Sequence, residues 1–561
     1  MSTTRDDTLV VRGGTVVDGT GEPPRRADVA IANGRIVEVG ESLKGDRELD
    51  ADGRIVAPGF IDIHTHYDAQ VFWDPALTPS VYHGVTTVVG GNCGFSIAPI
   101  RPDDRELMAH TMEKVEDMNP ATLLEGVPWD FETFGEYLGS VSRRGTVLNY
   151  GAYIGHTAVR LYAMGDEAVG RPANADELGQ MSAIIRDAMD AGAVGFATSF
   201  AATHIGADGR PIPSRWADRN ELETLFGAVA ETGKGVIGVN GGSNLSLRDN
   251  YVLQKQLGIP FTYTAVLTQP NGGHLKALEI NRQGWADGAE VWPQVSCRPL
   301  TFSMTLVDPF TLNTNSVFAE LSAGGLEGRR AAYADHAWRQ RARDEWDQPK
   351  AFRPRWSTME IMESTAHAEL IGKRIADIAA DRGTDAFDTL LDMALDEPDL
   401  LLRIRVVVAN DDVDGVTTLL QDEHTTLGLS DAGAHVGQLC DAPLPTDLLG
   451  NWVRDREVLA LETAIRKLTG QQADLFGFEG RGYVRPGAHA DLVVFDLDTI
   501  DPGPLRRVRD FPADSERLTA DAPTGMSHVL VNGEPIQIDG ESLPEAWDRR
   551  PGQLVRPAPR N

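Results

Sequence analysis

The feature that most constrains this chain is a series of eight short apolar runs, most of them separated by segments long enough for a helix. Apolar runs of this length, bounded by turn-forming residues, are typical of buried strands. The runs cover residues 60–66, 85–93, 147–156, 193–200, 235–240, 261–268, 289–296 and 425–431. Eight strands that alternate with helices predict an α/β chain whose centre is a (β/α)₈ barrel of the TIM type.

The helical segments carry start and stop signals of their own. One of them begins with Asn174, a good N-cap residue, and places Glu177 at the position of a capping box. Apolar residues then recur at spacings of three and four until Gly192. This pattern predicts a helix between Asn174 and Gly192, followed by the fourth strand.

The two ends of the chain differ from its middle, because each reads as short strands and turns. An Asn-Gly dipeptide lies between apolar runs at Asn33 and again at Asn532, and this dipeptide favours a tight β-hairpin. We therefore predict one small β-sandwich built from residues 1–57 and 476–545.

The barrel is expected to occupy residues 58–475. Two of its connections are long, at about 92–145 and at about 297–424. The second connection has helical patterns of its own and is a candidate lid. The final residues, 546–561, are rich in Pro and Arg and are expected to form an extended tail.

The charge of the chain narrows the range of its partners. Its 561 residues include 83 acidic and 52 basic side chains, which gives a formal net charge of −31. Such a surplus of negative charge repels phosphates and anionic membrane surfaces, so neither nucleic acid nor a membrane is expected as a partner. We expect a small-molecule substrate, and the sequence leaves a homo-oligomer open.

The cysteines and the N-terminal residues indicate the cellular compartment of the protein. Cys93, Cys297 and Cys440 lie far apart and form no C-x-x-C pair, which is the pattern of a reduced protein. The first residues are polar and lack the apolar stretch of a signal peptide. No apolar run approaches the ~18 residues that a membrane helix needs. We therefore expect a cytoplasmic protein.

The first strand carries a pair of histidines, His64 and His66. Alternate residues of a strand point to the same side, so these two side chains project together. In a barrel of this type the active site lies at the C-terminal ends of the strands. Two imidazoles that converge there supply half of a divalent metal site.

Two further residues end strands that neighbour the first one. Asp431 ends the eighth strand, which lies beside the first in a closed barrel, so its carboxylate can bind the metal and act as the general base. Cys93 ends the second strand within a Gly-Gly-Asn-Cys-Gly run, and a thiolate is a good zinc ligand. A buried structural role for Cys93 stays open. The predicted metal ligands are therefore His64, His66, Asp431 and Cys93, with Asp431 also catalytic.

These motifs resemble the amidohydrolase superfamily and, within it, the N-acyl-D-amino-acid deacylase (D-aminoacylase) branch. The resemblance extends over nearly the whole chain and is carried by residues 57–68, 83–94, 155–160, 429–435 and 481–495. It implies a metal-carrying barrel, a sandwich built from both termini, and hydrolysis of an amide or a related acyl bond. It also implies that His64 and His66 are ligands, that Cys93 is a zinc-binding thiolate, and that Asp431 is both ligand and base.

The chain departs from this branch at the ends of strands five and six. The branch has a histidine at each of these ends, and the two histidines hold the tightly bound zinc together with the cysteine. Here strand five ends at Asn240, whose amide cannot replace an imidazole, and strand six ends without a histidine. We therefore expect one divalent ion, Zn²⁺, rather than two. Recruitment of another histidine stays open, and the candidates near predicted strand ends are His156, His204 and His435.

Substrate recognition is assigned to the end of the seventh strand and its continuation. Trp292 and Phe302 are candidates for an apolar wall, and the planar guanidinium of Arg298 is a candidate partner for a substrate carboxylate. Ordinary packing and a surface arginine explain these residues equally well. The candidate substrate-binding set comprises Asn240, Trp292, Arg298, His156, His204 and His435.

Three functions are compatible with these patterns. The preferred prediction is hydrolysis of an N-acyl amino acid-like amide by metal-activated water with Asp431 as the base. The first alternative is a non-hydrolytic lyase, decarboxylase or isomerase that uses the same single metal. The second is an inactive barrel that serves as a binding or scaffold protein. The presence of His64, His66 and Asp431 together favours an enzyme.

Overall fold

The structure, a computed structural model, describes residues 8–206, 209–242, 244–321, 324–348 and 353–560. The chain divides into two compact units. The first comprises Met1–Arg298, Asp412–Val436 and Cys440–Asn561, and the second comprises Pro299–Asp411 and Gly437–Leu439. Most of the long connection expected at about 297–424 therefore belongs to the second unit.

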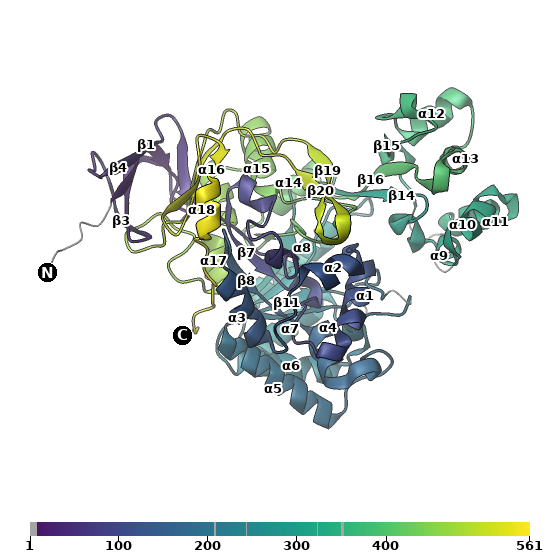
Figure 1. Ribbon diagram of the computed structural model, residues 1–561, viewed down its shortest axis with the longest axis horizontal. Coiled ribbons are helices and arrows are strands. Elements are labelled where there is room, and N and C mark those ends of the chain that lie inside the picture. The colour runs from purple at the N-terminus through teal and green to yellow at the C-terminus, as the bar shows by residue number, and fades with distance from the viewer. Residues whose placement is uncertain (1–7, 207–208, 243, 322–323, 349–352, 561) are drawn as a thin grey trace. The chain divides into compact units, whose positions relative to one another are not determined.

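The two ends of the chain meet in one nine-stranded sheet of the first unit. Its strand order is β23-β22-β21-β18-β5-β1-β2-β3, with β4 paired to β1. Figure 1 labels β1, β3 and β4 of this sheet. The strands are β1 (Leu9–Val16), β2 (Arg25–Ala32), β3 (Arg35–Gly40), β4 (Arg47–Asp50), β5 (Ile55–Pro58), β18 (Leu492–Phe495), β21 (Met526–Val531), β22 (Glu534–Ile538) and β23 (Glu541–Ser542). The ends are joined by the antiparallel pair of β5 and β18, in which Val493 lies opposite Ala57.

Both predicted Asn-Gly hairpins are confirmed. Ala32 pairs with Arg35 across Asn33 and Gly34, and Val531 pairs with Glu534 across the second dipeptide. Asn33 and Asn532 both adopt positive φ, which is the conformation that a tight hairpin turn requires. A separate hairpin forms from β19 (Leu505–Phe511) and β20 (Ser515–Ala520).

Parallel strands form the second β structure of the first unit. They are β6 (Phe60–Asp62), β7 (Val85–Gly90), β8 (Asn149–Ala152), β9 (Ile154–Gly155), β10 (Gly195–Ser199), β11 (Val236–Asn240), β12 (Phe261–Thr264), β13 (Val291–Val295) and β17 (Thr426–Leu427). One sheet contains β6, β7 and β8, and the other runs in the order β17-β13-β12-β11-β10-β9. Every predicted apolar run contains at least one of these strands, so the predicted strand positions are confirmed.

The two parallel sheets are connected at both sides. Between β8 and β9 lies only Tyr153, whose N–H donates to the Gly90 carbonyl at 3.0 Å. On the other side Thr65, just beyond β6, forms a parallel bridge with Ala432, just beyond β17. The pairings therefore lead from β6 round to β17 and back to β6. We call this set of strands the parallel ring.

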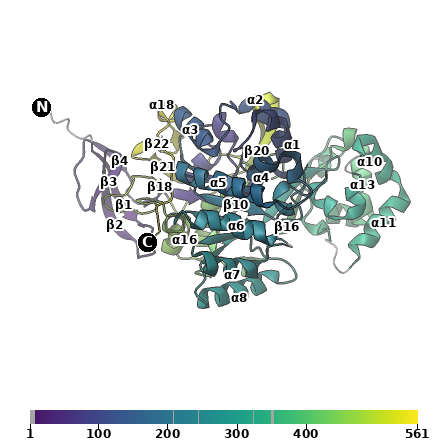
Figure 2. The ribbon, with the colours of Figure 1, turned by 90° about the horizontal axis from the view of Figure 1, so that it is seen from below.

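Helices lie between successive ring strands along the chain, and three more follow the last of these strands. They are α1 (Arg105–Glu116), α2 (Pro120–Gly126), α3 (Phe134–Arg144), α4 (His156–Met164), α5 (Ala175–Ala191), α6 (Arg219–Ala230), α7 (Leu247–Leu257), α8 (Gly273–Ala286), α14 (Val413–Gln421), α15 (Leu444–Asp447), α16 (Leu461–Leu468) and α17 (Gly470–Phe476). The predicted capping box is confirmed at the start of α5, where the Asn174 side chain accepts from the N–H groups of Asp176 and Glu177. Helices α5 to α8 pack in succession, as Figure 2 shows.

The C-terminal segment is not extended throughout. It contains α18 (Pro544–Arg549), which lies partly within the residues expected to form an extended tail. Beyond this helix, Tyr150 of β8 donates to the Gln553 carbonyl and accepts from the Val555 N–H, each at 2.9 Å. The end of the chain therefore runs parallel to β8 and pairs with it.

The second unit has its own small sheet and its own core. The sheet is antiparallel with the order β14-β16-β15. Its elements are β14 (Leu300–Thr305), β15 (Glu360–Glu363), β16 (Arg403–Ala409), α9 (Ser316–Ala319), α10 (Gly325–Ala334), α11 (His336–Trp346), α12 (Ile375–Arg382) and α13 (Ala386–Asp396). Aromatic rings fill the core, with Phe318 packed against Trp338, Trp346 and Phe387.

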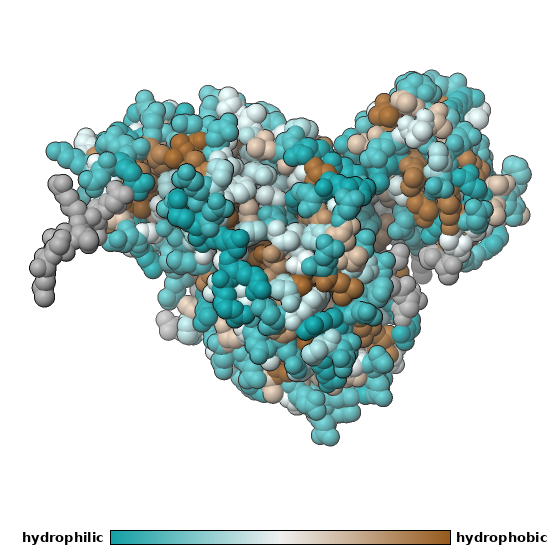
Figure 3. Space-filling view, in the orientation of Figure 1, coloured by the Kyte–Doolittle hydropathy of each residue, from teal (hydrophilic) through white to brown (hydrophobic). Residues whose placement is uncertain are grey.

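The surface is rich in polar residues. The face shown in Figure 3 is largely hydrophilic, with apolar residues in scattered groups. This distribution agrees with the formal net charge of −31. No helix in the described part of the chain is both long enough and apolar enough to cross a membrane.

Candidate metal centre

The histidine pair lies directly beyond β6, where strand pairing continues past the last assigned residue. Thr65 donates its N–H to the Val89 carbonyl at 3.1 Å, and His66 donates its N–H to the Ala432 carbonyl at 2.7 Å. The extended backbone between these contacts points His64 and His66 to the same side, with ring centroids 5.5 Å apart. Both side chains are almost completely buried. The pair is thus fixed by hydrogen bonds to both neighbouring strands.

Cys93 reaches the histidines from the turn that follows β7. It adopts φ 54°, between Gly91 and Gly94, which also have positive φ. A Cβ at Gly91 would lie 2.3 Å from the Tyr153 carbonyl oxygen, so only glycine fits this position. The turn places Sγ of Cys93 3.6 Å from Nε2 of His64. One candidate ligand atom from each of His64, His66 and Cys93 lies within 4.8 Å of the others.

Asp431 approaches the same histidines from the segment after β17. Its Oδ1 atom lies 3.1 Å from Nε2 of His64 and 3.9 Å from Nε2 of His66. Leu429, Asp431 and His435 all adopt positive φ, a conformation that costs a residue other than glycine roughly 1–3 kcal/mol. The parallel bridge between Thr65 and Ala432 anchors this segment beside the first strand.

The acidic groups dominate the electrostatics of this cluster. Burial alone would lower the pKa of His64, but the charges of Cys93 and Asp431 outweigh burial and raise this pKa to about 10. Burial would conversely raise the pKa of Cys93, yet His64 and His66 lower it to about 7. The same two histidines hold the pKa of Asp431 below its usual range, despite its burial. Cys93 and Asp431 therefore favour their anionic forms.

The residues present fit a divalent metal ion. Two imidazoles, a thiol of lowered pKa and a carboxylate converge, and this is a donor set typical of zinc. The buried atoms Nδ1 of His66 and Oε2 of Glu116 have no hydrogen-bond partner within the described residues. A buried group of negative charges needs a compensating cation, and a metal ion supplies one. We call His64, His66, Cys93 and Asp431 the metal centre.

Comparisons with known proteins agree with this geometry. A sequence profile described as the Amidohydrolase family matches residues 47–537. The chain is 30% identical to N-acyl-D-glutamate deacylase of Alcaligenes xylosoxydans xylosoxydans over 573 aligned residues, which cover 98% of this chain and 96% of that protein. The chain belongs to the amidohydrolase family. This amidohydrolase is a hydrolase that acts on carbon–nitrogen bonds other than peptide bonds.

Solved structures extend the similarity. N-acyl-D-glutamate deacylase from Bordetella bronchiseptica, complexed with zinc and a phosphonate inhibitor, is 27% identical with a TM-score of 0.68, and the match covers 99% of this amidohydrolase and all (100%) of that chain. A D-aminoacylase studied for its binuclear metal centre is 26% identical with a TM-score of 0.67, over 98% of this amidohydrolase and 100% of that chain. Metal dependence is therefore a property of its relatives.

The strand-five position that lacks the expected histidine contacts the cysteine instead. Asn240 ends β11, and its Nδ2 atom donates to Sγ of Cys93 at 3.4 Å. Such a bond favours the anionic form of the sulfur, because it stabilises negative charge. In this amidohydrolase Asn240 thus contacts a candidate ligand of the metal.

Two further histidines lie near the metal centre without joining the ligand group. His204 is half-buried, and its Nδ1 lies 2.7 Å from Oγ of Ser199. Burial lowers the pKa of His204 to about 3, and the nearby charges that act on it are those of Glu116, His435, His66 and Asp431. His435 follows Asp431 in the same positive-φ segment. Both histidines are therefore neighbours of the centre.

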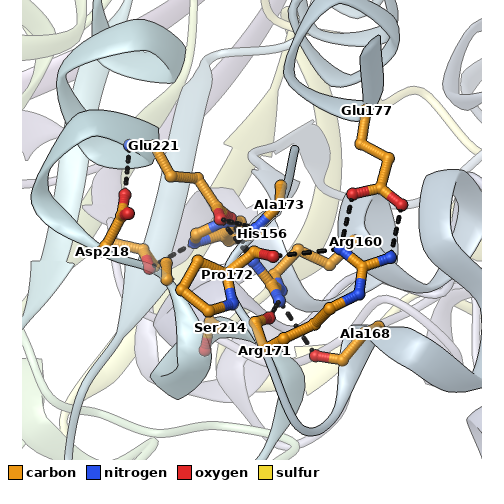
Figure 4. A network of polar contacts seen from close by, with 12 residues as sticks. His156, Arg160, Ala168, Arg171, Pro172, Ala173, Glu177, Ser214, Asp218 and Glu221 are labelled. Atoms are coloured by element: carbon orange, nitrogen blue, oxygen red, sulfur yellow. Dashed lines mark hydrogen bonds and ion pairs between the residues drawn. The ribbon is translucent and has the colours of Figure 1, made fainter. Parts of the chain in front are cut away.

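His156 lies in a different buried network. Its Nδ1 is 2.8 Å from Oγ1 of Thr198, and its Nε2 is 2.9 Å from Oε1 of Glu221 (Figure 4). Arg160 forms a fully buried ion pair with the same carboxylate. Both ring nitrogens of His156 are thus engaged within what we call the His156 network, comprising His156, Arg160 and Glu221.

The predicted substrate residues of the seventh strand have other partners. The Nε1 atom of Trp292 donates to Glu290 at 3.3 Å, and its ring packs edge-on against Trp285. The guanidinium of Arg298 lies 2.6 Å from Asp441 and 3.5 Å from Asp447. These contacts place both side chains within packed clusters of the protein. They do not join the metal centre.

Three residues near the centre were missed from the sequence. Glu116, at the end of α1, lies with Oε1 3.1 Å from Nδ1 of His66. Oε1 of Gln294, on β13, lies 2.6 Å from Nδ1 of His64. Asp68 accepts from the Gly91 N–H at 2.7 Å and so fixes the Cys93 turn. The two-residue spacing from His64 to His66 continues to Asp68 and could have marked it, whereas no local signal marked Glu116.

Proposed function

We propose that this chain is a metal-dependent amidohydrolase that hydrolyses an N-acyl amino acid-like amide, with Asp431 as the general base. In this proposal the parallel ring is a (β/α)₈ barrel, and the sheet built from both termini is a small accessory domain. The observation that carries the proposal is the position of Oδ1 of Asp431, 3.1 Å and 3.9 Å from the Nε2 atoms of the two histidines.

We propose one Zn²⁺ ion, held by His64, His66, Asp431 and Cys93. The single ligand group found among the described residues, and the amide of Asn240 at the end of strand five, favour one ion over two. When bound, the ion would act as a Lewis acid that polarises the scissile carbonyl and lowers the pKa of the attacking water. The relatives described with zinc or with a binuclear centre support a divalent metal.

A side chain of the protein itself transfers the proton of the attacking water. Asp431 is the group that accepts it from the attacking water, because its neighbouring histidines keep the carboxylate ionised. Its second role is to deliver this proton to the leaving nitrogen, so that the amine departs uncharged. Burial of His64 and His66 lowers the local dielectric constant, which strengthens electrostatic interactions of the centre with the transition state.

The test is turnover of a panel of N-acyl-D-amino acids and their L-enantiomers by zinc-loaded protein in ¹⁸O-labelled water. The panel spans acetyl to bulky aromatic acyl groups and acidic to apolar amino acids. We expect stoichiometric release of amine and of a carboxylate that contains one solvent oxygen. Product formation without solvent oxygen would identify a lyase or isomerase, and no turnover of any member would contradict the proposed substrate class.

A further inference from the structure

The two histidines of the metal centre present the same ring nitrogen to its middle. Nε2 of His64 lies 3.1 Å and Nε2 of His66 lies 3.9 Å from Oδ1 of Asp431. The Nδ1 atom of each ring therefore points away from the centre, toward the surrounding protein. A neutral imidazole can offer its Nε2 lone pair to a metal only when its proton is on Nδ1. The hydrogen-bond partners of the two Nδ1 atoms therefore determine whether both Nε2 lone pairs are available to a metal ion.

Gln294 occupies this position for His64. Its Oε1 atom lies 2.6 Å from Nδ1 of His64, and its side chain is buried on β13. Gly428, directly after β17, leaves the space for it, because a Cβ there would lie 2.5 Å from Oε1 of Gln294. The amide oxygen can only accept, so it selects the His64 tautomer with its proton on Nδ1.

Glu116 occupies the same position for His66, and it comes from a distant part of the chain. Its Oε1 atom lies 3.1 Å from Nδ1 of His66, and its side chain is only 2% exposed. The backbone carbonyl of Glu116 accepts from the Val436 N–H at 3.1 Å, which ties the end of α1 to the segment that carries Asp431. Nδ1 of His66 has no hydrogen-bond partner of full geometry in the described residues, so this carboxylate oxygen at 3.1 Å is the acceptor within reach of its proton.

We propose that Gln294 and Glu116 are positioning residues of the metal centre, each accepting the Nδ1 proton of one histidine so that both Nε2 lone pairs face the metal ion. This inference rests on the proposed function, because it requires that the centre binds a metal. It goes beyond that function by assigning two residues that do not touch the ion. The acceptors differ in charge, since Gln294 is neutral and Glu116 is a carboxylate.

These acceptors matter more here because strands five and six contribute no histidine to the centre. His64 and His66 are the only imidazoles in the ligand group found among the described residues. Partners that orient a metal-binding histidine typically account for about 10–100-fold in metal affinity. Loss of either acceptor should therefore weaken binding of the metal without removing any of its ligands.

The experiment measures the dissociation constant of Zn²⁺ for the full-length protein by competition with a chromophoric chelator. Gln294→Leu and Glu116→Leu remove the acceptors, and we expect about 10–100-fold weaker binding in each. Gln294→Glu and Glu116→Gln keep an acceptor oxygen, and we expect each to stay within about tenfold of wild type. The matched control is Glu397→Gln, a buried carboxylate of the second unit that accepts from the Thr365 N–H.

Two spectroscopic measurements separate positioning from other roles. In wild-type protein loaded with Zn²⁺, ¹⁵N NMR of labelled histidine should show Nδ1 protonated and Nε2 bound to metal for both residues. This measurement holds even where a leucine variant fails to fold. X-ray absorption of Glu116→Gln should show an unchanged number of nitrogen and oxygen neighbours around zinc.

The outcomes distinguish this inference from the proposed function. Wild-type protein that binds no zinc would contradict both. Zinc binding of wild-type strength in folded Gln294→Leu and Glu116→Leu, or ligation through Nδ1 of either histidine, would overturn only the positioning roles. Loss of one oxygen neighbour in Glu116→Gln would make Glu116 a ligand, which also overturns its positioning role.

Discussion

Two buried histidines of this protein lie beside carboxylates, yet their pKa values are shifted in opposite directions. His64 of the metal centre has a pKa raised to about 10, because the charges of Cys93 and Asp431 outweigh its burial. His156 has a lowered pKa, because burial outweighs the contribution of Glu221. The difference follows from the cations nearby. Arg160 shares the Glu221 carboxylate with His156, whereas acidic groups surround His64.

The nature of the compensating cation distinguishes a structural cluster from a metal site. In the His156 network an arginine compensates the carboxylate, and both ring nitrogens of His156 have partners. In the metal centre the acids Cys93 and Asp431 face the Nε2 atoms, and a metal ion would take the place that Arg160 fills in the network. A surplus of buried acid around histidines therefore identifies a site for a cation.

Asp431→Asn is the single substitution with the largest expected effect on turnover. It removes the proposed base while keeping the shape of the side chain, so we expect turnover to fall by about 10²–10⁴-fold. The measurement is amine release from the best N-acyl amino acid of the panel, with circular dichroism to verify the fold. The corresponding carboxylate-to-amide change in the other cluster, Glu221→Gln, should leave turnover per folded molecule within about twofold. Full activity of Asp431→Asn would show that Asp431 is not the general base.

Glu221→Gln should act on stability instead. It leaves the fully buried guanidinium of Arg160 without its counter-ion, and breaking such a pair typically costs about 3–5 kcal/mol. Urea unfolding at pH 7 measures this change. Glu223→Gln is the control, because the exposed pair of Glu223 with Arg219 on the same helix should contribute at most about 1 kcal/mol. An equal effect of the two changes would show that the network is not a stabilising cluster.

The stability of the His156 network should depend on pH in an acidic window. Despite burial, His156 and Arg160 lower the pKa of Glu221 from 4.5 to about 2. The resulting contribution, roughly 3 kcal/mol, is present above pH 4.5 and is lost as the pH falls from 4.5 toward 2. The difference in unfolding free energy between wild type and Glu221→Gln should therefore shrink over this range. A difference that stays constant from pH 7 to pH 3 would contradict the lowered pKa.

Metal removal should give the smallest change in stability but a complete change in activity. A ligand at 100 times its dissociation constant stabilises the folded state by about 2.7 kcal/mol. Unfolding of chelator-treated protein with and without added zinc measures this difference, and zinc should also restore turnover. A variant with His64→Ala and His66→Ala should show no zinc-dependent stabilisation, whereas Glu221→Gln should keep it. Equal stabilisation by zinc of wild type, the double histidine variant and Glu221→Gln would show that the metal binds at another site.

Much of the fold was readable from local patterns. Each apolar run contained a ring strand, and the capping box at Asn174 marked the start of α5. The hairpins at Asn33 and Asn532 followed from their Asn-Gly dipeptides. Such signals depend on a few consecutive residues, so they can be recognised in the sequence without knowledge of the fold. The helix that extends into the C-terminal tail was missed, because the tail as a whole is rich in Pro and Arg.

The site was readable only in part. His64, His66, Cys93 and Asp431 each lie beyond the C-terminal end of a parallel strand, and parallel strands bring these ends together, so their proximity could be anticipated. Glu116 could not be found in this way, because it lies at the end of a helix in a long connection. The partners of Arg298 were also hidden, since Asp441 and Asp447 lie far away in the chain.

The sequence by itself determined the strands, the capped helices and the residue types that can bind a metal, because these depend on short-range periodicity and chemistry. The tertiary structure alone decided which buried histidine shares its carboxylate with an arginine and which has Cys93 and Asp431 beside its Nε2 atom. His64 and His156 are both histidines near strand ends, and nothing local separates them. Arg160 beside Glu221, and Cys93 with Asp431 around His64, supply the difference. The net charge around a buried group depends on residues that folding brings together from several segments. No single segment of the sequence therefore reveals it.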